Sequence, residues 1–228
     1  MPVWLRVFCL VVLFAPAPAL AQVPPSAAEI AAYSGLHAAA AKGDSAEIEK
    51  LVKGGAALEA RDGHRRTPLH VAAHLKRVEA AALLMKLGAD ANALEADKYD
   101  IVTIAAVADD VPMLKIALAC GCKATNITSR YDGTALIAAA HLGHDEVVRI
   151  LIAAGAPLDH VNNLHWTALI ESIVLGDGGK RHTATLDHLV KAGANLNLAD
   201  RNGNTPLMLA RGRGYKDMVA ILEKAGAK

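Results

Sequence analysis

Residues 67–73 are Thr67-Pro68-Leu69-His70-Val71-Ala72-Ala73. Threonine is one of the residue types that cap helix N-termini, and proline fits the first helical turn, where its missing N–H costs nothing. Leu69, Ala72 and Ala73 follow at helical spacing on one face. The segment therefore predicts the start of a helix. Its two alanines predict closely packed neighbouring helices, because larger side chains would push those helices apart.

The same segment recurs along the chain at a nearly fixed interval. Copies start near residues 34, 67, 100, 134, 167 and 205, at spacings of 33, 33, 34, 33 and 38 residues. In five copies a glycine follows the start by 21 residues: Gly55, Gly88, Gly121, Gly155 and Gly226. The copy at 167 reaches Gly193 only after 26 residues, so it carries five extra residues. A fixed period of this length indicates a repeat architecture.

The rest of each copy predicts a second helix and a turn. Residues 146–152 place apolar side chains at spacings of three and four, and Gly155 lies just past their end, where a left-handed helix cap favours glycine. The short polar run at 200–204 is typical of a tight turn. No single unit of this kind buries its apolar face alone, so we expect the units to stack.

This pattern resembles the ankyrin repeat, whose unit is 33 residues long with a T-P-L-H-x-A-A core. The resemblance covers about residues 30–228. It implies an all-α solenoid of six stacked helix-turn-helix units, joined by short β-turn fingers. Residues 22–33 would form an N-terminal capping segment, and residues 34–228 the six repeats. It also implies structural roles for three histidines: His37 and His70 would use their rings in local hydrogen bonds, and His144 would occupy the turn between two helices.

The first 21 residues predict a secretory signal peptide. Arg6 precedes an apolar run that is broken by Pro16 and Pro18 and ends in Ala19-Leu20-Ala21. These are the three regions of a cleaved signal, and the apolar part is too short and broken to span a bilayer. We expect cleavage after Ala21, a periplasmic or secreted protein and no later membrane insertion. The signal also resembles those of exported proteobacterial ankyrin proteins, some of which are thought to support oxidative-stress defence.

Composition and motifs exclude several classes of function. The net charge of +1 argues against a strongly basic nucleic-acid binder, and three cysteines are too few for a disulfide-framed domain. The chain has no G-x-S-x-G elbow, P-loop or dinucleotide fingerprint. The Asp109-Asp110 pair is expected to face water. We therefore predict no enzyme activity, no cofactor, and a monomer that binds an unidentified protein partner.

The candidate partner-binding residues lie on the fingers. The residue before each repeat start is presented there and is typically free to vary for binding. Those residues, with a second aromatic from the fourth finger, include Arg66, Tyr99, Tyr131, Trp166 and Asn204. Aromatic and arginine side chains are favoured anchors in protein interfaces. The alternative is that the rings pack on adjacent fingers and stiffen the row.

Cys120 and Cys122 offer an alternative function, a redox- or metal-responsive module. A disulfide across one residue would be strained and easily reduced. Metal binding by this pair alone is weaker as a hypothesis, because tetrahedral zinc takes about four ligands. The simplest interpretation is two small, partly buried side chains. A metal site built on any of the ten histidines is not expected either, because no acidic or cysteine residue recurs near them at the spacing of metal ligands.

The five extra residues of the fifth unit fall within 177–182. This segment is glycine-rich and charged, and it lies between the two expected helices, at the edge remote from the fingers. We expect a mobile surface loop there.

Overall fold

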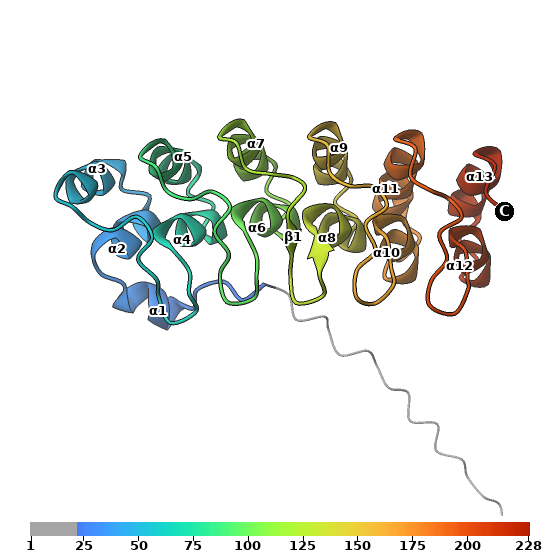
Figure 1. Ribbon diagram of the computed structural model, residues 1–228, viewed down its shortest axis with the longest axis horizontal. Coiled ribbons are helices and arrows are strands. Elements are labelled where there is room, and N and C mark those ends of the chain that lie inside the picture. The colour runs from blue at the N-terminus through green and yellow to red at the C-terminus, as the bar shows by residue number, and fades with distance from the viewer. Residues whose placement is uncertain (1–21) are drawn as a thin grey trace, which may run out of the picture.

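The computed structural model of the chain describes residues 22–228 and contains thirteen helices within them. The predicted signal peptide lies outside the described residues. After α1 (Ala27–Ala32), the helices form six antiparallel pairs (Figure 1). The pairs are α2 (Gly35–Lys42) with α3 (Ser45–Lys53), α4 (Pro68–His74) with α5 (Val78–Lys86), α6 (Ile101–Val107) with α7 (Val111–Ala119), α8 (Ala135–Leu142) with α9 (Asp145–Ala153), α10 (Ala168–Val174) with α11 (Lys180–Lys191), and α12 (Pro206–Gly212) with α13 (Lys216–Lys224). The predicted all-α solenoid of six units is confirmed.

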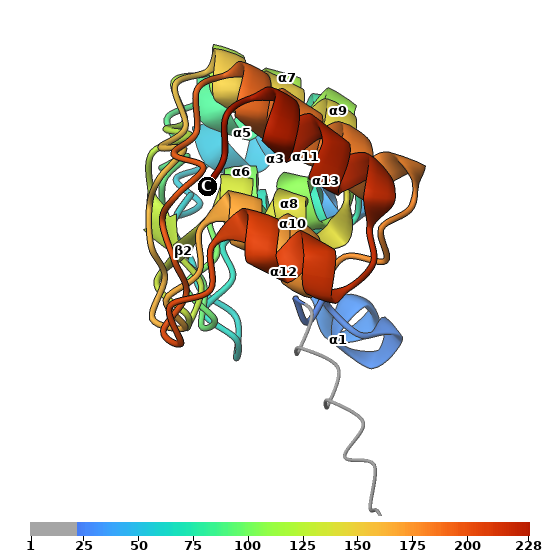
Figure 2. The same ribbon diagram turned by 90° about the vertical axis from the view of Figure 1, so that its right-hand side faces the viewer.

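The pairs stack into two parallel rows. The first helices contact one another in the order α2, α4, α6, α8, α10 and α12, and the second helices do the same from α3 to α13. Seen from the end, the fingers project from the row of first helices, and α1 lies beside that row (Figure 2). We call the row of first helices the inner row, and the surface that it forms with the fingers the inner face.

The first helices begin where the repeat predicts. Thr67, Thr134, Thr167 and Thr205 each accept a hydrogen bond from the backbone N–H three residues later, and Asp100 does so in the third unit. Such caps satisfy a backbone donor that the first helical turn leaves free. Each second helix is followed by a glycine at positive φ: Gly55, Gly88, Gly121, Gly155, Gly193 and Gly226.

The core lies between the two rows and continues through the stack. The third position of every unit is a buried aliphatic residue: Leu36, Leu69, Val102, Leu136, Leu169 and Leu207. Full burial of such a side chain contributes about 2 kcal/mol. The alanines at positions six and seven, such as Ala72 and Ala73, are also buried. They allow the close approach of neighbouring inner helices that the sequence predicts.

Each finger is numbered by the unit that it precedes, and the second to sixth fingers span residues 56–66, 89–99, 122–133, 156–166 and 194–204. Within residues 22–228, the structure assigns strands only to the fourth unit's finger, where β1 (Ile127–Thr128) pairs antiparallel with β2 (Gly133–Thr134). One polar side chain near the middle of each finger accepts hydrogen bonds from two backbone N–H groups across the turn. These residues are Asp62, Glu95, Ser129, Asn162 and Asp200.

The fifth unit absorbs its insertion largely as helix. Lys180 to His182 form the first residues of α11, which has 12 residues against nine in α9. His182 donates from Nε2 to the carbonyl oxygen of His141 at 3.0 Å, and Arg181 pairs with Asp109 and Asp145. The expectation of a mobile loop over 177–182 is therefore wrong for residues 180–182, because they are helical and these contacts hold them against the third and fourth units.

Candidate binding face

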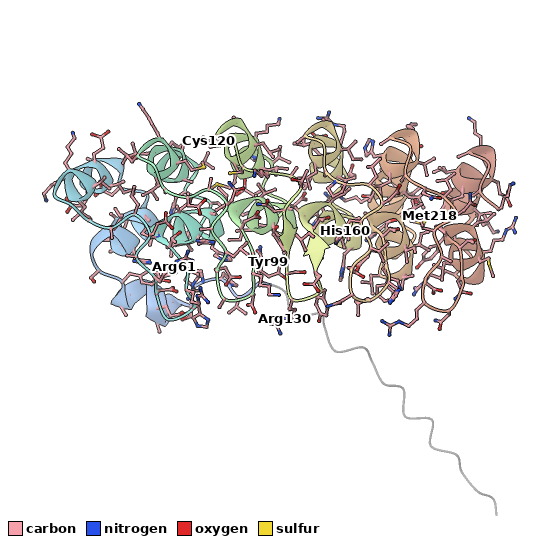
Figure 3. The ribbon with its side chains drawn as sticks, in the orientation of Figure 1. Arg61, Tyr99, Cys120, Arg130, His160 and Met218 are labelled. Carbon is pink, nitrogen blue, oxygen red and sulfur yellow. The ribbon has the colours of Figure 1, made fainter. Side chains whose placement is uncertain are left out.

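The five finger residues named from the sequence differ in their exposure. Tyr99, Tyr131, Trp166 and Asn204 are half-buried, whereas Arg66 is 0% exposed. Tyr99 lies on the face of its finger, and Arg130 lies at the tip of the next one (Figure 3). Burial raises the pKa of Tyr99, and the nearby Asp97 adds to this rise. Tyr99 therefore stays a neutral phenol.

Arg66 corrects the expectation that it is presented to a partner. Its guanidinium pairs with Asp62 at 2.8 Å and with Glu29, and it also donates to the carbonyl oxygen of Val23. The N-terminal segment supplies two of these three acceptors. Arg66 therefore joins residues 22–33 to the second finger, and its side chain is covered.

The same junction holds a chain of acidic and phenolic groups. Tyr33 donates its hydroxyl to Asp62 at 2.6 Å. Burial alone would raise the pKa of Asp62, but hydrogen bonds from Tyr33 and Arg66 outweigh it and lower the pKa to about 2. Hydrogen bonds from Ser26 and the charge of Arg66 lower the pKa of Glu29 to about 2. Both carboxylates are thus ionised partners of the buried cation.

A cavity of about 240 Å³ opens on the inner face between the third, fourth and fifth units. Tyr99 and Tyr131 contribute from two neighbouring fingers, and Ile137 and Leu142 contribute from α8. Gln22, the first described residue, also lines the cavity. The N-terminal segment therefore runs from the second finger toward the middle of the inner face, as Figure 1 shows.

Two polar residues of the fifth unit line the cavity wall. Glu171 on α10 is 4% exposed, and its Oε1 accepts a hydrogen bond from Nδ2 of Asn162 at 2.9 Å. Its Oε2 lies 3.2 Å from Nδ1 of His141 but makes no hydrogen bond. The cavity is thus apolar over most of its walls and has a buried carboxylate on one side.

The remaining two finger candidates lie outside this cavity. Trp166 donates its backbone N–H to Oδ1 of Asn162, and its side chain is half-buried on the fifth finger. Asn204 donates from Nδ2 to both carboxylate oxygens of Asp200, at 3.2 and 3.1 Å. Asn204 therefore stabilises its own turn, whereas Tyr99 and Tyr131 are brought together at one cavity.

Backbone hydrogen bonds and an ion pair join neighbouring fingers. One backbone hydrogen bond joins each of three successive pairs: Ala96 to His64, Ser129 to Lys98, and Asn163 to Tyr131. Arg130 also pairs with Asp97 across the third and fourth fingers. These bonds set the spacing of the two tyrosines.

No disulfide joins Cys120 and Cys122 in this structure. Cys120 is exposed at the end of α7 and Cys122 is buried, and both are free thiols. Burial, with the nearby Asp100 and Cys120, raises the pKa of Cys122 to about 12, so its thiol stays protonated at neutral pH. Cys120 lies by the second helices, away from Tyr99 (Figure 3).

The three repeat histidines bond to backbone carbonyls of a neighbouring finger or unit, and His70 also bonds locally to Thr67, as the resemblance implies for that residue. His37 donates to Arg66, His70 to Ala93 and His144 to Ala106, each through a ring nitrogen to a backbone carbonyl. Within residues 22–228, no three His, Cys, Asp or Glu side chains gather in a metal-binding arrangement. None of the helices in that range is long and apolar enough to span a membrane.

Glu171, Asn162 and the place of His141 at the cavity were not predicted from the sequence. Aligning the six units position by position would have singled out Glu171. The other five units have Ala38, Val71, Ile104, Ala138 and Leu209 at the position that Glu171 occupies. One carboxylate in an otherwise apolar column marks a residue that the packing alone does not require.

Comparisons with known proteins agree on the repeat. A family model for ankyrin repeats (three copies) matches residues 21–95 and 102–197, and a single ankyrin repeat matches 202–228. The ankyrin repeat protein YahD of Escherichia coli (strain K12) is 31% identical over 190 residues, which cover 83% of this chain and 94% of that protein.

Solved structures give the same result. An ankyrin repeat domain from Acinetobacter baumannii AYE is 44% identical, with a TM-score of 0.81, and the match covers 85% of this chain and 98% of that one. The ankyrin repeat domain of Bcl-3, described as a unique member of the IkappaB protein family, is 28% identical, with a TM-score of 0.77. That match covers 86% of this chain and 88% of the Bcl-3 domain.

Proposed function

Because this chain belongs to the ankyrin repeat family, we propose that it is a protein-binding scaffold that holds its partner on the inner face. Ankyrin repeats form protein–protein interaction scaffolds and are generally non-enzymatic. The cavity between Tyr99 and Tyr131 is the observation that carries this proposal. Half-buried aromatic rings beside an apolar cavity supply the anchors that dominate most protein interfaces.

The proposal includes an exported location and a monomeric state. The pattern of residues 1–21 supports cleavage after Ala21 and a periplasmic or secreted protein. The family resemblance supports a role beside oxidative-stress defence enzymes. N-terminal sequencing of the exported protein should give Gln22, and retention of Met1 would reject the location.

The binding face is tested by a pull-down from periplasmic extract. Tyr99 and Tyr131 together change to Ala, and Arg149→Ala serves as the control because Arg149 is exposed on α9 in the outer row. We expect the double variant to recover at least tenfold less partner than wild type does. The control variant should recover as much partner as wild type. Circular dichroism checks the fold of each variant. Equal recovery by a folded double variant would reject this face.

A further inference from the structure

Glu171 is an acidic residue in a position that packing fills with apolar side chains. It lies on α10, is 4% exposed, and faces the cavity of the inner face. Removing a carboxylate from water is costly unless charged or hydrogen-bonding partners replace the water. Glu171 therefore needs an explanation beyond the stability of the repeat.

Only half of that carboxylate is satisfied within the described chain. Oε1 accepts from Asn162, whereas Oε2 is buried and has no hydrogen-bond partner. His141 is its nearest basic neighbour, with Nδ1 at 3.2 Å, but the geometry does not make a hydrogen bond. Oε2 thus lies behind the cavity wall without a hydrogen bond, and His141 is the one basic side chain that the described residues place within ion-pair distance of it.

The rest of the cavity suits an aliphatic chain. Tyr99 and Tyr131 line the cavity from the fingers, and Val107, Ile137 and Leu142 line the helical side. Aromatic faces attract cations as well as apolar groups. A lysine or arginine side chain combines the aliphatic stem that these walls accept with the cationic head that a carboxylate binds.

The chain's own N-terminal segment reaches this cavity in a non-helical conformation. Residues 22–26 have no helix or strand and run to the cavity, where Gln22 contributes a side-chain amide. Nε2 of Gln22, a hydrogen-bond donor, is itself buried without a partner. A non-helical segment that carries a donor side chain therefore already reaches this site.

We infer that the cavity between Tyr99, Tyr131 and Glu171 is a subsite for one lysine or arginine side chain in an extended segment of the partner protein. This inference rests on the proposed function and adds the chemistry of the partner. The basic head pairs with the carboxylate of Glu171 after a small shift of the side chains that cover Oε2, and its stem lies between the tyrosines and α8.

The test is a random array of synthetic twelve-residue peptides, probed with the purified chain from residue 22 onward. Wild type is compared with Glu171→Gln, which keeps the size of the side chain and an acceptor for Asn162. Glu146→Gln, on the exposed surface of α9, is the matched control for the loss of one negative charge. Circular dichroism verifies that all three proteins fold.

We expect peptides bound by wild type and by Glu146→Gln to be enriched in one Lys or Arg, and Glu171→Gln to lose that enrichment. In the strongest peptide, replacing the basic residue by norleucine should weaken binding to wild type at least about tenfold. The same replacement should leave the affinity for Glu171→Gln nearly unchanged, because the coupled partner is already absent.

Two results would overturn the subsite. If peptides bind without a basic preference, or keep it with Glu171→Gln, the inference fails while the inner face remains a binding surface. If wild type binds no peptide, the inference also fails. The pull-down with the Tyr99 and Tyr131 variant then judges the proposed function separately.

Discussion

Arg66 shows how one side chain joins the repeat to a segment outside it. Its residue type and its place before Thr67 could be predicted from the sequence, but its burial could not. The reason is that the covering acceptors, Glu29 and Val23, lie 37 and 43 positions away and outside the repeat pattern. A periodic pattern predicts contacts between equivalent positions, and this contact has no equivalent in the other units.

Arg66→Met should lower the free energy of unfolding by about 3 kcal/mol at pH 7. The change leaves Asp62 and Glu29 close together without their cation, which is the costly way to break a buried ion pair. Urea unfolding measures the loss. Arg65→Met, one residue earlier and exposed, should change the free energy of unfolding by less than about 0.5 kcal/mol. Equal losses in the two variants would contradict the buried pairing.

Two histidines should make stability depend on pH between about 4 and 6.5. Burial lowers the pKa of His70 to about 4, and burial together with the nearby His70 does the same for His74. A histidine with a lowered folded pKa binds its proton more readily when unfolded, so its stabilising contribution is full above pH 6.5 and is lost as the pH falls.

For His70 the loss between pH 7.5 and pH 5 should be about 2 kcal/mol, measured by urea unfolding. His70→Gln retains a donor for the carbonyl of Ala93 and does not titrate. Its unfolding free energy should therefore fall less over the same pH range. If the unfolding free energy of this variant falls as steeply as that of wild type, groups other than His70 cause the pH dependence.

At the scale of the single element, each finger from the second to the sixth contains a residue in the left-handed backbone conformation at the same position. The residue two before each first-helix cap has positive φ in five fingers: Arg65, Lys98, Asp132, His165 and Gly203. Only the last of these is glycine, the residue that adopts this conformation without strain. The repeat spacing predicts that a turn lies there, but four non-glycine residues conceal its left-handed geometry from the sequence.

Gly203→Ala should therefore lower the free energy of unfolding by about 1 kcal/mol. An added Cβ would meet no atom within 4 Å, so the cost comes from the backbone at φ 80° alone. Gly212→Ala is the matched opposite, because Gly212 ends α12 without positive φ and also has open space around it. That variant should gain about 0.5 kcal/mol. Urea unfolding of both distinguishes backbone strain from crowding.

At the scale of the whole molecule, the units depend on their neighbours. Leu136 on α8 is 0% exposed, at the centre of the stack. Leu136→Asp buries an unpaired carboxylate at a cost of several kcal/mol, and nearest-neighbour coupling spreads the damage to both sides. We expect a large loss of helical circular dichroism or a much lower melting temperature.

Leu142→Asp is the control for that substitution. It lies on the same helix but is 40% exposed, so its melting temperature should change little. If both variants melt like wild type, the assignment of the core is wrong.

The sequence predicts this architecture well because each unit repeats the same local rules. Caps, alanines and terminal glycines recur in phase, so six weak predictions reinforce one another. The binding cavity follows no such rule. It combines Tyr99, Tyr131 and Glu171 from three successive units, and each departs from what its equivalents carry. Departures from a repeat become a site only when the stack brings them together in space.

The bonds between neighbouring fingers make the molecule unequally stiff. Opening one interval of the finger row breaks one backbone hydrogen bond and a few exposed side-chain bonds, such as Arg61 to Leu94 or Asn163 to Arg130, and water replaces these partners at a net cost of about 1 kcal/mol for each bond. Opening the opposite edge separates two second helices and exposes apolar side chains along their length. Thermal bending is therefore larger in the direction that spreads the fingers. A partner wider than the resting spacing of the fingers is admitted by several small rotations, one at each joint, without melting any unit.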